Sequence, residues 1–396
     1  MINTAVSPHD FSVKLPPARL SALDFHRGLI MALMALDHAS MLVARRHAQE
    51  YWGAALPVFP DSFWFMVRWL THVCAPGFAM LMGVGIVLLV EARVRKGWDM
   101  THVRRYLINR GMLLVVLQLL VEDPAWILGI FSAHPGAAIT WGDMAGGGSD
   151  VRLHLGVLFS LGMSMMVWAL MLELPSWTIA LLSTLTLIVT EYLVSIQPGP
   201  GALVAPWLRV LAVAGHTNAW DVAYPVLPWL GVSGLGVLIG RGLLHDQQAT
   251  QRSALWAAVG LALLFIVLRA AGGLGNLNSV PPGLAGFFTV VKYPPSIAFV
   301  AVTLSLNLAL LAQWSRLPGW MTHAHNPLVT FGRCALMFYL VHLWLFAAMG
   351  LMFRGGAGPA TMLLAWITGL VLMWLFCRWY LRFRSTRRVN SMWQFF

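Results

Sequence analysis

The sequence contains few charged residues and very few cysteines. Asp, Glu, Lys and Arg make up 10% of its 396 residues, whereas 59% are hydrophobic and the mean hydropathy is +0.72. Because a soluble domain is usually about 25% charged, this composition excludes a soluble globular fold and indicates a polytopic membrane protein. Cys74, Cys334 and Cys377 all fall in apolar runs, which argues against a disulfide framework and favours small hydrophobic packing roles.

Other signals are also missing. Residues 1–18 have no apolar core followed by a cleavage site, so we expect no signal peptide. No repeat of fixed period is visible, which weakens the case for an inverted-repeat transporter. The formal net charge is +11, but the basic residues cluster between hydrophobic segments, so nucleic acid is not an expected partner. No set of Cys and His has metal-ligand spacing, so no metal is expected.

Ten hydrophobic stretches are long enough to cross a bilayer, which takes about 20 residues. They predict an all-α bundle of about ten transmembrane helices over 19–382, preceded by the segment 1–18 and followed by a basic tail over 383–396. Lys and Arg gather in the connection after the second stretch and in the tail, which predicts that both termini are cytoplasmic (N-in and C-in). The predicted spans are 21–44, 63–90, 106–131, 153–172, 176–196, 222–240, 253–271, 293–313, 327–350 and 360–380.

The first predicted span carries the ionisable residues Asp24, Arg27, Asp37 and His38. Such groups cost several kcal/mol inside a bilayer unless they are paired or hydrated, so they indicate a functional cavity. At about 100° per residue Arg27 and His38 share a helix face and lie roughly 16 Å apart along the axis. A neutral imidazole with a carboxylate nearby is a competent base. This interpretation is favoured over a helix-end histidine wetted by lipid headgroups.

The second span has polar residues next to a proline. Thr71 and His72 precede Pro76 by about one turn, and proline frees a backbone carbonyl inside a helix. A freed carbonyl beside an imidazole is a typical polar lining for a cavity. A kink with a histidine that satisfies the backbone explains the pattern equally well.

Two later spans contain further candidates. Tyr339 and His342 are one turn apart on one helix face, whereas Arg333 is out of phase with His342. One cavity can therefore take both Arg333 and His342 only if the helix is irregular or Arg333 reaches around its end. Arg333 suits either a snorkelling anchor or a phosphate clamp. Lys292 opens another span beside two prolines, a position that structure alone also explains.

Taken together, these motifs resemble one bacterial membrane family. The motifs are Arg-Leu-Ser-Ala-Leu-Asp-Phe-His-Arg-Gly over 19–28, Met-Ala-Leu-Asp-His over 34–38, Thr-His-Val-Cys-Ala-Pro over 71–76, Tyr-Pro-Val-Leu-Pro-Trp over 224–229, Lys-Tyr-Pro-Pro-Ser over 292–296 and the Phe-Gly-Arg…Phe-Tyr…His pattern over 331–342. The family is domain of unknown function 1624, which is grouped with the catalytic domain of heparan-α-glucosaminide N-acetyltransferase. The resemblance implies an integral membrane acyltransferase. It further implies that the donor is cytosolic acetyl-CoA and that the acceptor is a sugar amine or hydroxyl of a periplasmic or envelope glycan across the bilayer.

The charge and position of particular residues indicate the roles that we expect for them in such a reaction. Arg27 and Arg333 would hold the CoA phosphates, and His38 would deprotonate the acceptor, aided by Asp37 or His72. Direct transfer is preferred to an acetyl-histidine intermediate, because one base and an apposed thioester suffice. The other residues expected to line the cavity are Asp24, Thr71, Tyr339, His342 and Lys292.

Alternatives remain open for both the base and the function. The lysosomal enzyme carries Asn at the position of His38, and its proposed active histidine falls nearest His47, so the base is one of His38, His47 and His72. A proton-coupled transporter or permease would use the same ionisable residues for passage. A non-catalytic subunit of envelope glycan assembly would use them only to lock helices together. The expected location is a bacterial inner membrane. Acceptor identity, acyl chain length and oligomeric state stay open.

Overall fold

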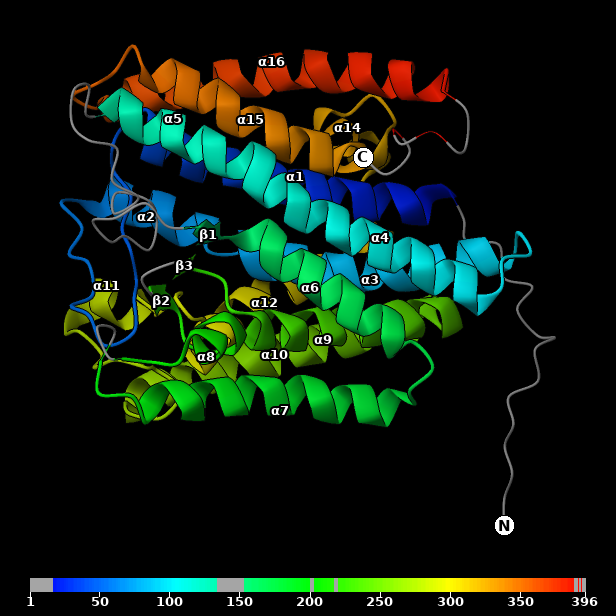
Figure 1. The fold of residues 1–396 in the computed structure, drawn as a ribbon, viewed down its shortest axis with the longest axis horizontal. Helices are drawn as coiled ribbons and strands as arrows, with labels where there is room; N and C mark the ends of the chain where they lie inside the picture. Colours follow the sequence, from blue (N-terminus) through cyan, green and yellow to red (C-terminus); the bar gives the residue numbers. More distant parts are fainter. Residues whose placement is uncertain are drawn as a thin grey trace.

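The computed structural model describes residues 17–133, 153–199, 203–216, 220–387, 391 and 393. The predicted segment 1–18 and the end of the predicted tail 383–396 therefore lie largely outside the described residues. The longer helices run side by side along one axis, with most connections gathered at the two ends (Figure 1). The α-helices are α1 (Pro17–Leu42), α2 (Ser62–Thr71), α3 (Cys74–Val94), α4 (Met100–Leu117), α5 (Asp123–Ala133), α6 (Val157–Leu170), α7 (Ser176–Ser195), α8 (Pro206–Leu211), α9 (Val226–His245), α10 (Gln247–Ala271), α11 (Gly283–Phe288), α12 (Ile297–Ala312), α13 (Gly319–Thr322), α14 (Pro327–Arg333), α15 (Ala335–Gly350) and α16 (Pro359–Ser385).

The multi-pass helical architecture is confirmed, and each predicted span coincides with a helix or a run of helices. Within the described ranges, six helices are long and apolar enough to cross a membrane, or seven if the bent pair Gly319–Arg333 and Ala335–Gly350 counts as one. The helices α6 and α12 are apolar but only 14 and 16 residues long, and α1 carries several charged residues. The full count of ten spans and the N-in, C-in orientation stay predictions.

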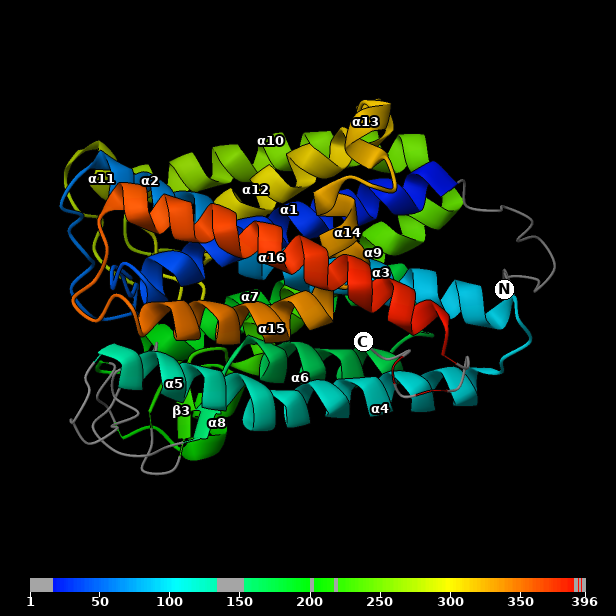
Figure 2. The ribbon, with the colours of Figure 1, turned by 90° about the horizontal axis from the view of Figure 1, so that it is seen from above.

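The polar first helix lies inside the bundle, and other helices face outward. α1 packs against α14, α15, α16, α2 and α3, while α3 packs on α9, α4 on α6 and α10 on α12. Figure 2, turned by 90°, shows α1 enclosed between neighbouring helices. In the apolar windows of α7, α10 and α16, only 28%, 22% and 28% of the residues are buried. Their exposed Leu, Ile and Trp side chains therefore form a surface suited to lipid.

Glycine allows the central helices to approach closely. A Cβ on Gly28 of α1 would lie 1.7 Å from the carbonyl oxygen of Leu328 in α14, and one on Gly332 would lie 1.9 Å from that of Asp24. A Cβ on Gly83 of α3 would lie 2.0 Å from the Ser233 oxygen in α9. Small residues at such contacts are a common device of membrane helix packing.

Two helix interruptions lie where polar residues enter the bundle. The helix ends at Thr71 and resumes at Cys74, and Nδ2 of Asn307 donates to the Val73 carbonyl at 3.2 Å. A second break lies at Cys334, where α14 and α15 meet at 73°. Arg333 and His342 would be out of phase on a regular helix. This break is the irregularity that allows both to face adjoining parts of the bundle interior.

A small sheet departs from the predicted all-α fold. It contains β1 (Leu153–Leu155), β2 (Gly215–His216) and β3 (Trp220–Val222), with β3 in the middle, parallel to β1 and antiparallel to β2. The register places His154 opposite Asp221. We call the end of the bundle that carries this sheet the sheet end (left in Figure 1).

Next to the sheet, two loop segments join. The backbone N–H groups of Lys292 and Tyr293 both donate to the carbonyl of Glu50, at 2.9 and 3.1 Å, and Trp52 N–H donates to the Tyr293 carbonyl at 3.1 Å. The ring of Tyr51 stacks on that of Tyr293 with centroids 5.0 Å apart. These contacts fix Glu50 and Lys292 beside the ends of α1 and α2.

Candidate functional site

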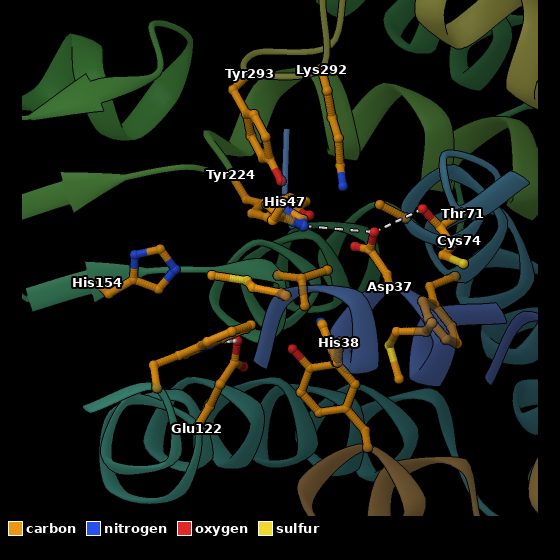
Figure 3. Close-up of a pocket in the computed structure, with 17 residues that line it drawn as sticks. Asp37, His38, His47, Thr71, Cys74, Glu122, His154, Tyr224, Lys292 and Tyr293 are labelled. Carbon is orange, nitrogen blue, oxygen red and sulfur yellow. Dashed lines mark hydrogen bonds and ion pairs between the residues drawn. The ribbon is translucent and has the colours of Figure 1, made fainter. Parts of the chain in front are cut away.

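Two cavities lie inside the described part of the bundle and adjoin each other. The sheet-end cavity (Figure 3) is lined mainly by ionisable and aromatic side chains: Met34, Asp37, His38, Met41, His47, Thr71, Cys74, Ala75, Phe78, Glu122, Trp126, His154, Val157, Tyr224, Lys292, Tyr293 and Tyr339. The arginine cavity is lined by Arg27, Arg110, Arg333 and Arg384 together with apolar residues of α1, α3, α4, α6 and α15. Phe78, Val157 and Tyr339 line both. The two cavities thus meet at these three side chains.

One wall of the sheet-end cavity is held together by Arg68. Its Nε and Nη2 donate to the two carboxylate oxygens of Glu50 at 2.8 and 2.6 Å, and its Nη1 donates to Asp37 at 3.0 Å. Thr71 Oγ1 also donates to Asp37, at 2.8 Å. A buried guanidinium that serves two carboxylates is a strong, geometrically defined contact. Asp37 is therefore a partner of Arg68 and Thr71.

Lys292 completes the charge balance of this wall. Its side chain is buried, lines the cavity and lies with Nζ 5.1 Å from the ring centroid of Tyr293. Among the described residues, its ammonium group makes no hydrogen bond or ion pair. The two carboxylates of Asp37 and Glu50 are thus matched by the two cations of Arg68 and Lys292.

His72 lies behind this wall and not among the residues that line the cavity. Its Nδ1 donates to the Arg68 carbonyl at 2.6 Å, and its Nε2 is 3.6 Å from Glu50. The first contact supports the Arg68 backbone, whereas Nε2 makes no hydrogen bond within the described residues. The structure therefore brings Asp37 and Thr71 to the cavity together with His38, and places His72 one layer further out.

The imidazole of His38 is bonded to a second histidine. His342 Nδ1 donates to the Phe338 carbonyl at 2.9 Å, which leaves its Nε2 as an acceptor. His38 Nδ1 lies 2.7 Å from that atom and is therefore assigned as the donor. Trp126 contacts the His38 ring edge-on at a centroid distance of 5.2 Å. In this arrangement the second nitrogen of His38, Nε2, is left as a proton acceptor.

His47 is a second imidazole on the cavity wall, supplied by the loop after α1. Its Nδ1 lies 3.8 Å from Asp37 and makes no hydrogen bond within the described residues. Burial lowers the pKa of His47, and the charge of Arg68 lowers it further, to about 3. Burial alone would raise the pKa of Glu50, but the charge and hydrogen bonds of Arg68 outweigh it and lower this pKa to about 2. His47 is therefore neutral and Glu50 ionised at neutral pH.

The opposite wall contains residues that the sequence patterns did not indicate. His154 Nδ1 lies 2.9 Å from Asp221 Oδ2, and both residues are buried. The hydrogen bond to Asp221 and the negative charge of that carboxylate favour the protonated form of the imidazole. Figure 3 shows His154 and Asp37 on opposite sides of the cavity.

A π-helical turn over Gln118–Glu122 stands beside His154. Glu122 Oε1 accepts from Trp126 Nε1 at 3.2 Å, while its buried Oε2 has no hydrogen-bond partner among the described residues. Gln118 Nε2 donates to Asp123 at 2.8 Å. Such turns are frequent at functional sites. Two adjacent acids inside the predicted span 106–131 were the signal available in the sequence.

The arginine cavity lies toward the other end of the bundle. Asp24 bridges two of its cations, lying 3.6 Å from Arg27 Nη1 and 3.4 Å from Arg333 Nε. Arg384 donates to the Arg333 carbonyl at 3.4 Å, and Arg110 completes the set. The sequence indicated Asp24, Arg27 and Arg333, whereas the patterns gave no reason to join Arg110 or Arg384 to them.

Of the five residues predicted to line the cavity, three line the cavities and two, Asp24 and His342, do not. Thr71 and Lys292 line the sheet-end cavity, Tyr339 lines both cavities, and His342 lies behind His38 with its ring centroid 4.9 Å away. No group of three or more His, Cys, Asp or Glu among the described residues is arranged to hold a metal ion.

Comparison with known families confirms the resemblance seen in the sequence. The family described as "Heparan-alpha-glucosaminide N-acetyltransferase, catalytic" matches residues 19–272, more than half of the chain. A second family, described as "Protein of unknown function (DUF418)", matches residues 238–386. No curated protein matches the chain. The first match contains Arg27, His38, His47 and His154, and the second contains Lys292, Arg333 and His342.

Proposed function

The chain belongs to the heparan-α-glucosaminide N-acetyltransferase catalytic family, and we propose that it transfers an acetyl group from acetyl-CoA to a glycan across the membrane. The acceptor atom is a sugar amine or hydroxyl. One observation carries the proposal: the arginine cavity and the sheet-end cavity meet at Phe78, Val157 and Tyr339. A donor at one end and an acceptor at the other can thus meet without either crossing the bilayer.

The arginine cavity suits the donor. Four guanidinium groups with one carboxylate, Asp24, between two of them give a net positive mouth that favours phosphate groups. The wall toward the junction is apolar, with Leu81, Ile86 and Leu107 among its residues. Such a lining fits the uncharged arm that carries a thioester. We assign Arg27, Arg110, Arg333 and Arg384 to the CoA phosphates.

The sheet-end cavity suits the chemical step. His38 Nε2 accepts the proton of the acceptor, whose nitrogen or oxygen then attacks the thioester carbonyl. His342 holds the required tautomer of His38 through the 2.7 Å contact. Asp37 and His72 act through Arg68, to which both are bonded. His47 is the second candidate for the base, because it lines the same cavity with an unbonded Nδ1.

The proposed setting is a bacterial inner membrane, with the arginine cavity toward the cytoplasm and the sheet end toward the periplasm. Two rival functions would use the same residues. A transporter or permease would carry a solute past them unchanged, and a non-catalytic subunit of glycan assembly would need them for helix packing only.

The test uses inverted membrane vesicles that contain wild type, His38→Ala or His47→Ala protein at matched abundance. Acetyl-labelled acetyl-CoA is supplied outside, glucosamine is loaded inside as a probe acceptor next to the endogenous glycan, and released CoA thiol and lumenal label are measured. We expect wild type to release CoA and label the lumen, and loss of the base to reduce the rate by about 100-fold or more.

The outcomes separate the hypotheses. No CoA release above vesicles without the protein overturns the acyltransferase assignment, and sugar uptake without modification then supports a transporter. Full activity in His38→Ala and loss in His47→Ala moves the base to His47. Loss in His38→Ala together with a lower unfolding temperature and abundance supports a packing role.

A further inference from the structure

The proposed reaction releases a thiolate that takes up a proton, and the second wall of the sheet-end cavity carries a group suited to donate it. We infer that His154, held by Asp221, is a further catalytic residue that protonates the departing thiolate, with Asp221 as its positioning residue. This inference rests on the proposed function. It concerns residues outside the motifs in which the sequence resemblance was recognised.

The strands β1 and β3 position this pair at the cavity. The parallel register of β1 and β3 sets His154 directly opposite Asp221, and Nδ1 lies 2.9 Å from Oδ2. The two residues are 4% and 2% exposed. Burying a carboxylate in this way is costly unless it is paired, and here its second oxygen, Oδ1, has no hydrogen-bond partner among the described residues. Asp221 is thus committed to the histidine.

The position of His154 in the chain brings it near the junction of the two cavities. Val157, which lines both cavities, follows three residues later at the start of α6. Gly156 between them fits closely, since a Cβ there would lie 2.9 Å from Gln118 Oε1 and 3.1 Å from Glu122 Oε1. The strand-to-helix turn therefore holds the imidazole on the sheet-end side of the point where a thioester entering from the arginine cavity would arrive.

The two imidazoles on opposite walls have different partners. His38 is bonded to another neutral imidazole, His342, and is suited to accept a proton. His154 is bonded to a carboxylate, with Glu122 and Asp123 as further acids nearby, while Lys292 and His47 lie across the cavity. One site can hold a base and an acid at the same pH when the surroundings of two titratable groups make their pKa values different.

Protons and bonds are balanced in this step when His38 and His154 both take part. His38 Nε2 takes the proton of the attacking amine or hydroxyl, and the new bond forms to the thioester carbonyl carbon. The C–S bond then breaks with its electron pair on sulfur, which takes the proton from His154 Nε2. Water returns the proton from His38 to His154, so the net change is one acetyl group exchanged for one proton between acceptor and CoA.

The test is a pH profile of CoA release in the vesicle assay, with wild type, Asp221→Asn, His154→Gln and the control His102→Gln. The control removes a histidine that likewise contacts an aspartate, Asp99, at 2.8 Å, but that is exposed and lines neither cavity. We expect the alkaline limb of kcat/KM to move down by about one pH unit in Asp221→Asn, because the opposite charge that favours the imidazolium is gone. His154→Gln should lower kcat about 100-fold with little change in KM for acetyl-CoA. His102→Gln should match wild type.

An alkaline limb that stays in place in Asp221→Asn overturns the inference, and it does so even if His154→Gln fails to fold. A KM effect in His154→Gln without a kcat effect also overturns it, since that would make His154 a binding residue. Inactive wild type instead contradicts the proposed function. The two failures are therefore distinct.

Discussion

Nδ1 of His38 lies 2.7 Å from Nε2 of His342, although 304 residues separate the two in the chain. The contact links the middle of the bundle to α15, and its direction is set by the bond from His342 Nδ1 to the Phe338 carbonyl. His342 therefore determines which tautomer His38 adopts.

Removing His342 should impair the proposed base without removing it. In His342→Phe, His38 loses the acceptor that fixes its tautomer, so we expect kcat to fall by roughly 10- to 100-fold while the protein stays folded. CoA release and an unfolding curve in detergent measure both effects. Activity equal to wild type would show that the His38 tautomer does not depend on this contact.

Arg68 should be the most important ion-pair residue for stability. In Arg68→Met, Asp37 and Glu50 remain buried without their cation, and breaking a buried pair in this way costs about 3–5 kcal/mol. The matched control is Arg95→Met, which breaks the partly exposed Arg95–Glu91 pair at the end of α3 and should cost about 0.5 kcal/mol or less. Similar unfolding free energies for the two variants would contradict the central role of Arg68.

Gly332→Ala should open the arginine cavity by pushing α1 and α14 apart. The new Cβ would meet the backbone oxygen of Asp24 at 1.9 Å, and backbone cannot move away as a side chain would. We expect a loss of about 1–3 kcal/mol of stability and a higher KM for acetyl-CoA. Gly260→Ala is the control, because a Cβ there has nothing within 4 Å. An unchanged KM for acetyl-CoA in Gly332→Ala would show that this close helix contact does not affect donor binding.

Acid should destabilise the protein through His47. Its pKa falls from 6.5 to about 3 on folding, so between these values the unfolded chain binds a proton that the folded chain does not. Stability is then intact above pH 6.5 and declines as the pH falls below it. Glu50 has a pKa of about 2 in place of 4.5, so the stability that its ionised form contributes is lost only as the pH falls below 4.5. We expect the unfolding temperature to fall less from pH 7 to pH 5 in His47→Gln than in wild type, and parallel falls would contradict this.

The predicted orientation can be tested with introduced cysteines, because Cys74, Cys334 and Cys377 are all buried. Ser279 lies in the exposed loop of the sheet end, and Ala324 is exposed at the opposite end. In intact cells a membrane-impermeant maleimide should label Ser279→Cys and spare Ala324→Cys, as cytoplasmic termini require. The reverse pattern would place the arginine cavity on the outside.

The sequence predicted which side chains of the first helix face the interior of the bundle. The 3.6-residue period and the cost of burying charge predicted that Arg27 and His38 face one cavity, whereas they line two separate cavities that adjoin at Phe78, Val157 and Tyr339. Tyr339 and His342 face the same region, with ring centroids 5.7 Å apart. Regular helices place such residues by geometry alone, so a single sequence is sufficient.

The rest of the site depends on contacts between distant segments, which the helical or strand periodicity of the sequence does not predict. Glu50 is positioned by a loop that pairs with Lys292, and His154 meets Asp221 through strands of two or three residues each. Strands this short leave no alternating pattern to detect. The partner of His38 also depended on the break at Cys334, which no proline marks.

The meeting point of the two cavities has a further consequence for a protein in an energised membrane. Two polar chambers that open toward opposite ends of a bundle would leak protons if a continuous file of water joined them. Phe78 and Val157 present hydrocarbon at that point, and an apolar constriction resists wetting. The proposed transfer needs only a short, uncharged acyl group to pass this point, so Phe78 and Val157 would at the same time restrict the passage of hydrated ions between the two faces of the membrane.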